Sequence, residues 1–104
     1  MTSKVKILLV AVLLLTVPSW AEDFPSLEQG KSLFESTELG SKQLSCAGCH
    51  PQGKGLDQIG DFNDEELKDI INACIRDAMG GALIGLDSPE MTALHGYVST
   101  FQKN

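Results

Sequence analysis

Two cysteines and a histidine lie within one short segment, Cys46-Ala47-Gly48-Cys49-His50. Residues three apart lie on the same side of a helical turn, so the thiols of Cys46 and Cys49 can react with neighbouring positions of one group. The imidazole of His50 follows directly, and a neutral imidazole is a good ligand for transition metals. The segment therefore combines two nucleophilic sulfur atoms with one metal ligand.

The spacing C-x-x-C-H is that of the attachment site for c-type haem. Its two thiols add to two vinyl groups on adjacent pyrroles, and the histidine then coordinates the iron. The small residues Ala47 and Gly48 let the backbone lie close to the macrocycle. We therefore expect one haem c per chain, bonded to Cys46 and Cys49, with His50 as the proximal ligand.

Other uses of a C-x-x-C pair fit the sequence less well. A closed zinc site takes four ligands, but Cys74 and His95 stand alone rather than as a second close pair. A thioredoxin-like redox pair belongs to a βαβ pattern, and no strand-rich stretch precedes Cys46. The chain has three cysteines, an odd number that internal disulfides cannot fully pair.

The N-terminal segment 1–21 has the organisation of a secretory signal peptide. Two lysines precede an unbroken apolar run over residues 7–17, and a small-x-small pattern ends at Ala21. The run is shorter than the ~20 residues that cross a bilayer, so we expect cleavage after Ala21 rather than a membrane anchor. The sequence thus predicts a periplasmic or secreted protein with no integral membrane segment.

After cleavage, residues 22–104 form a single small domain with an acidic balance. The removed segment carries two lysines and no acidic residue, so the formal net charge changes from −6 to −8. Negative charge disfavours nucleic acid and anionic membranes as partners, and favours redox partners with a basic docking surface.

N-cap residues mark the start of two helices on either side of the motif. Ser26 precedes a helix that we expect to end near Gly40, from which a polar loop leads to Cys46. Ser88-Pro89, a cap followed by proline, starts the last helix. The apolar stripe of that helix is Met91, Leu94, Val98 and Phe101.

A third long helix is predicted between these two. It begins at Asn63 or Asp64, where acidic residues favour a helix start, and it stops at Gly80-Gly81. Its apolar face consists of Leu67, Ile70, Ile71, Cys74, Ile75 and Ala78. The sequence therefore predicts an all-α fold.

Across its expected mature length the chain resembles the monohaem cytochrome c family. Gly30-x-x-x-Phe34 resembles the N-terminal helix motif of that family, and Leu94-x-x-Tyr97 resembles its C-terminal partner. The resemblance implies an orthogonal helix fold wrapped around one covalently attached haem, with Tyr97 lying over Gly30. The long polar loop before the C-x-x-C-H motif is similar to that of a subgroup with oxygen-binding cytochromes and relatives in thiosulfate oxidation.

The resemblance leaves the hydrogen-bond partner of the proximal imidazole to be found. No Pro-Leu dipeptide follows the motif to accept the imidazole N–H. We expect the Pro51 region, or a backbone carbonyl between Gly53 and Ile59, to take that role.

The sixth iron position has several candidate ligands. Met79 precedes the glycine pair, and a thioether ligand raises the reduction potential and suits electron transfer. Cys74 is on an apolar helix face, and its thiolate would lower the potential. Met91 is also a candidate, although core packing explains it more simply, and Asn72 is a weaker one by resemblance to the subgroup. His95 is expected at the surface or half-buried.

Three functions are compatible with these ligands. A six-coordinate haem favours a one-electron carrier between redox partners, which is not an enzyme. An open or Cys74-ligated iron favours a protein that binds a gas or a sulfur compound. A haem subunit of a larger oxidoreductase has the same sequence features.

Overall fold

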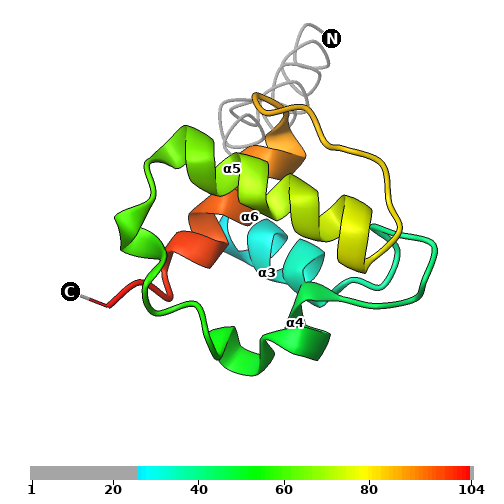
Figure 1. The fold of residues 1–104 in the computed structure, drawn as a ribbon, viewed down its shortest axis with the longest axis horizontal. Coiled ribbons are helices and arrows are strands. Elements are labelled where there is room, and N and C mark those ends of the chain that lie inside the picture. The colour runs from blue at the N-terminus through cyan, green and yellow to red at the C-terminus, as the bar shows by residue number, and fades with distance from the viewer. Residues whose placement is uncertain (1–25, 104) are drawn as a thin grey trace, which may run out of the picture.

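The computed structural model describes residues 26–103, and within this range every regular element is helical (Figure 1). The elements in chain order are α3 (Leu27–Glu35), α4 (Cys46–Cys49), the 3-10 turns η2 (Pro51–Gly53) and η3 (Ile59–Asp61), α5 (Asp64–Ala73), the π turn η4 (Cys74–Ala78) and α6 (Pro89–Ser99). The predicted all-α fold is confirmed for these residues. The predicted signal peptide, 1–21, lies outside them.

Side-chain caps start the three longer helices. The hydroxyl of Ser26 accepts the backbone N–H of Gln29, whose side chain accepts the N–H of Ser26 in return. Asn63 and Glu66 make the same reciprocal pair at the start of α5, which decides between the two predicted cap positions. Ser88 caps α6 as predicted, with proline in the first turn. Each cap satisfies N–H groups that have no partner within the helix.

Helix α3 ends at Glu35, before the predicted end near Gly40. Ser36 takes an extended backbone conformation, and its hydroxyl accepts the N–H of Glu38 at 3.0 Å. This local hydrogen bond competes with continuation of the helix. The polar loop before α4 consequently spans residues 36–45.

Helix α5 continues into a π turn, which the sequence analysis did not predict. The N–H of Met79 donates to the carbonyl of Cys74, five residues earlier, at 3.1 Å. A π turn fits one more residue into the turn than an α-helix does, and such turns are frequent at functional sites. The element stops at Gly80, where φ is +72°, so the glycine pair ends the helical segment as predicted.

The closest helix pair is α3 and α6. A Cβ atom added to Gly30 would overlap the carbonyl oxygen of Ala93 and lie 2.5 Å from Cβ of Tyr97, so only glycine fits. Phe34 packs beside this contact, with its ring centroid 5.4 Å from that of Tyr97 and 5.5 Å from that of Phe101. The predicted placement of Tyr97 over Gly30 is confirmed, and the aromatic rings lock the two helices together.

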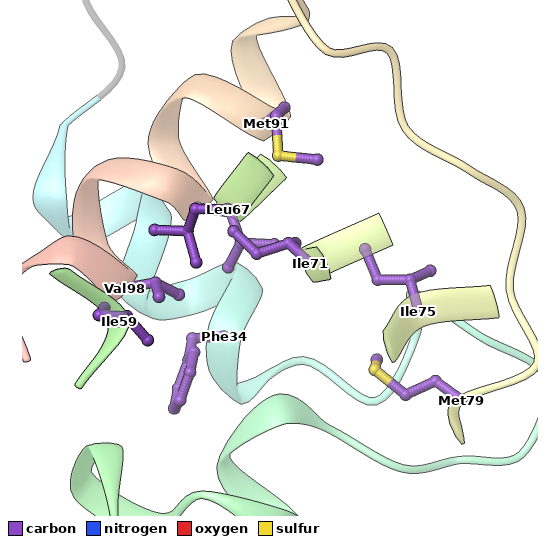
Figure 2. Close-up of a cluster of buried hydrophobic side chains, with 9 residues drawn as sticks. Phe34, Ile59, Leu67, Ile71, Ile75, Met79, Met91 and Val98 are labelled. Carbon is purple, nitrogen blue, oxygen red and sulfur yellow. The ribbon is translucent and has the colours of Figure 1, made fainter. Parts of the chain in front are cut away.

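The hydrophobic core lies where α5 packs against α3 and α6, and Figure 2 shows its buried side chains. The core comprises Phe34, Ile59, Leu67, Ile71, Ile75, Met79, Met91, Leu94 and Val98. Only half of the predicted apolar face of α5 and η4 enters it. Leu67, Ile71 and Ile75 are buried, whereas Ile70 is 38% exposed and Cys74 and Ala78 are also exposed. The second half of the face borders a pocket.

No helix within residues 26–103 has the length and apolar character needed to cross a membrane.

Candidate haem-attachment site

The C-x-x-C-H segment forms a single capped turn. The hydroxyl of Ser45 accepts the N–H of Gly48 at 3.0 Å, which starts α4, and the N–H of His50 donates to the carbonyl of Cys46 at 2.8 Å. Pro51 has no N–H to continue the helical hydrogen bonds, so α4 ends at Cys49. The turn places the two thiols and the imidazole at one side of a common pocket.

That pocket separates α4 from α5 and η4. Cys46, Cys49 and His50 line it from α4, and Ile70 and Ile71 line it from α5. The remaining side chains are nearly all apolar and include Phe34, Leu56, Ile59, Leu67, Leu94 and Val98. The pocket is thus a largely apolar space with two thiols and one imidazole at its edge.

Backbone geometry fixes the tautomer of His50. Its Nδ1 lies 2.8 Å from the carbonyl oxygen of Lys54. A carbonyl oxygen can only accept, so Nδ1 carries the proton and Nε2 keeps a free lone pair. A second hydrogen bond of this kind orients an imidazole and makes it a better metal ligand. The predicted acceptor, a carbonyl between Gly53 and Ile59, is therefore that of Lys54.

Two of the candidate distal ligands, Met79 and Cys74, line the same pocket. The π turn brings both there, because the hydrogen bond from Met79 to Cys74 spans one turn and returns the chain to the same side. Met79 is only 3% exposed, and Figure 2 shows it at the Ile75 end of the core. Cys74 lies on the outer, exposed part of the helix face.

The structure places the other candidates outside the pocket. Met91 is 0% exposed and is packed in the core on α6. Asn72 is buried on α5 and holds the following loop: its amide donates to the carbonyl of Ile84, and its side-chain oxygen accepts the N–H of Ile84, both at 2.8 Å. Its polar atoms are thus committed to the loop. His95 is half-buried, as predicted, with Nε2 3.4 Å from a carboxylate oxygen of Asp64.

The three thiols influence one another. Burial raises the pKa of the Cys46 thiol, and the nearby Cys74 raises it further. Burial likewise raises the pKa of Cys74, with a contribution from Cys49. A charged thiolate is disfavoured in an apolar space and beside another thiolate. Both groups are therefore neutral thiols at pH 7.

The residues fit a haem better than a bare metal ion. Within residues 26–103, no group of three or more His, Cys, Asp or Glu side chains is arranged to hold a metal ion. An iron here therefore needs a macrocycle to supply most of its ligands. Ile70 and Ala78 form an exposed apolar border that a flat apolar group would cover.

The size of the pocket adds a condition to this fit. It encloses about 120 Å³, whereas pockets for drug-sized ligands measure about 300–1,000 Å³. A porphyrin thus requires an exposed edge or an outward displacement of α4. The free thiols of Cys46 and Cys49 are on the element that would move.

Three features of the site were absent from the sequence analysis. They are the cap at Ser45, the π turn at residues 74–78 and a contact between the polar loop and Met79. The serine three residues before Gly48 is a recognisable cap signal. The other two have no local sequence signal, because each depends on segments that meet only in the folded chain.

Comparisons with known proteins leave these residues as the basis for assigning a function. No family model, curated protein or solved structure matches the chain significantly.

Proposed function

We propose that the chain is an exported monohaem cytochrome c that carries single electrons between redox partners. The observation that supports this most directly is the shared pocket: Cys46, Cys49 and His50 line it together with Met79. In the proposal, the two thiols become thioethers and His50 Nε2 coordinates the iron. When bound, the haem supplies a one-electron change between ferric and ferrous iron.

Residues of the chain keep the two ligand sides in place. The Lys54 carbonyl holds His50 Nδ1–H at 2.8 Å, so Nε2 keeps its lone pair free for the iron. Met79 approaches from η4 with a neutral thioether, which stabilises ferrous iron and raises the potential. The apolar side chains around them limit water, and a site that changes little in structure between oxidation states favours fast electron transfer.

The acidic surface supports a partner of opposite charge. Five exposed carboxylates lie at or near the start of α5, where residues 61–69 run from one end of the pocket: Asp61, Asp64, Glu65, Glu66 and Asp69. Charges of one sign accelerate encounter with a basic partner and weaken that encounter as salt rises. The expected partner is therefore a redox protein with a basic docking surface, met in the periplasm or outside the cell.

A second function has one observation in its favour. Cys74 lines the pocket alongside Met79, so a thiol-ligated or open iron is a distinct arrangement of the same residues. Such a protein would bind a gas or a sulfur compound at the distal side. A haem subunit of a larger oxidoreductase is separated from a free carrier by the size of the native assembly.

The test is a visible spectrum of the processed protein, made in a host with cofactor-assembly machinery. We expect a mass increased by one haem, resistance of the reduced protein to carbon monoxide, and a weak ferric band typical of methionine ligation. Rapid carbon monoxide binding by the wild type would transfer support to the gas-binding function. A polypeptide with no added porphyrin would overturn both.

A matched pair of variants identifies the distal ligand. Met79→Leu and Met91→Leu make the same chemical change, one in the pocket and one in the core. We expect Met79→Leu to lose the methionine band, lower the potential and bind carbon monoxide, while Met91→Leu keeps the wild-type spectrum. An unchanged Met79→Leu spectrum would contradict the assignment, and Cys74→Ser then tests the thiol.

A further inference from the structure

The polar loop before the C-x-x-C-H motif contacts the chain at the end of η4. The N–H of Lys42 donates to the carbonyl of Met79 at 3.1 Å. Ser41 donates twice to the carbonyl of Gly80, from its N–H at 3.2 Å and from its hydroxyl at 3.0 Å. In Figure 1 the loop runs beside the yellow end of this helical segment.

The contact is closed by glycines on both sides. A Cβ atom on Gly40 would overlap the carbonyl oxygen of Met79 and lie 2.9 Å from its Cβ. A Cβ atom on Gly81 would overlap the carbonyl oxygen of Leu39. The two backbones thus approach as closely as glycine permits. We name residues 39–42 the strap.

Both backbone polar groups of Met79 are therefore fixed. Its N–H is held within the π turn by the carbonyl of Cys74, and its carbonyl is held by the strap through Lys42. Its side chain leaves this fixed backbone to line the pocket. The chain continues from the strap through only two residues to Ser45 and α4, so the strap also links Met79 to the attachment turn.

We propose that the strap positions Met79 as the distal ligand and sets how easily another ligand displaces it. This inference rests on the proposed function, and it assigns a role to the long polar loop. Gly40 and Ser41 are positioning residues, since they act through the Met79 backbone. Loss of their contacts lets the η4 end move away from the pocket and weakens the iron–thioether bond.

The experiment measures imidazole binding to the ferric holoprotein by stopped-flow absorbance. Ser41→Ala removes one hydrogen bond and is expected to raise the binding rate about threefold to tenfold, the range that corresponds to one neutral hydrogen bond. Gly40→Ala is expected to raise it more than tenfold, because its methyl group displaces the Met79 carbonyl. Both variants should also lose intensity in the methionine band.

Two controls separate positioning from general loosening. Ser36→Ala removes a serine hydrogen bond in the same loop, the one to Glu38, without touching Met79. Gly85→Ala places a Cβ 3.7 Å from its nearest neighbour, Ser88, which is an ordinary contact. We expect both controls to keep the wild-type imidazole rate, whatever small change they cause in thermal stability.

The outcomes distinguish this inference from the function on which it rests. If Ser41→Ala binds imidazole at the wild-type rate and Gly40→Ala, when folded, does so too, the strap has no positioning role. If Met79→Leu also leaves the rate unchanged in a haem-containing protein, the ligand is not Met79 and the strap proposal fails while haem attachment stands. A wild type without haem overturns the proposed function itself.

Discussion

The α3–α6 contact and the pocket beside α4 are packed in opposite ways. At the first, Gly30 brings two helix backbones together, and three aromatic rings with centroids 5.2–5.5 Å apart fill the space next to it. At the second, a four-residue helix faces an apolar space, and Ile70, at 38%, remains exposed. The same helix, α5, contributes to both regions with opposite halves of its apolar face.

The difference teaches that the two regions depend on different sources of stability. The helix contact is complete with protein atoms alone, since burial and close packing supply its free energy. The pocket exposes apolar side chains to water, which is unfavourable unless another group covers them. A bound haem, by occupying the native state only, would stabilise that second region most.

The largest effect is expected from removing the attachment chemistry. The double variant Cys46→Ser with Cys49→Ser should carry no covalent haem and be poorly folded, with residues 46–62 losing amide protection before α3 and α6. Mass spectrometry and hydrogen exchange measure the two parts. Cys74→Ser, which keeps both attachment thiols, is the control and should retain the haem. Earlier loss of protection at the α3–α6 contact would break the comparison.

The next largest effect concerns the other region. Gly30→Ala should lower the free energy of unfolding by about 1–3 kcal/mol, the usual cost of an overpacked contact. Gly96→Ala, also within the helix pair, is the matched control, because its added Cβ would be 4.0 Å from Leu27. Thermal unfolding of the holoprotein measures both, and the haem spectrum should not change. Equal stability of the two variants would contradict the close approach at Gly30.

A smaller effect is expected at the loop between η4 and α6. Asn72→Ala removes both hydrogen bonds to Ile84 and leaves that peptide without its partners, which should cost about 1–2 kcal/mol. Faster amide exchange in residues 80–87 should accompany the loss. Asn72→Asp keeps the acceptor and should fall between the wild type and Asn72→Ala. A loss of the methionine band in Asn72→Ala would instead implicate this loop in ligand binding.

The smallest effect is a pH dependence of the haem-free protein. The pKa values of Cys46 and Cys74 are raised above 9.0 in the folded chain, so the folded state retains protons that the unfolded state releases. The stabilisation is complete below the unfolded pKa and is lost as pH rises through the folded values. Urea unfolding on both sides of pH 9.0 should show this decline, and Cys74→Ser should make it shallower. A rise in stability over that window would reverse the sign.

The local chemistry of the helix starts could be predicted from the sequence. The caps at Ser26 and Ser88 and the start of α5 within one residue follow from side chains that bond to N–H groups two or three positions away. The end of α3 was wrong, because Ser36 and Glu38 form a competing local bond. The resemblance, rather than the spacing alone, predicted that Tyr97 lies over Gly30, which the close contact confirms.

Within the candidate site, the sequence alone determined the reactive groups and their order: two thiols one turn apart, followed by an imidazole. Only the tertiary structure decided which carbonyl holds His50, that Asn72 is engaged with Ile84, and that Met79 rather than Met91 reaches the pocket. The physical reason is range. Caps and turns depend on neighbours along the chain, whereas a pocket is formed by segments whose approach depends on the packing of the whole domain.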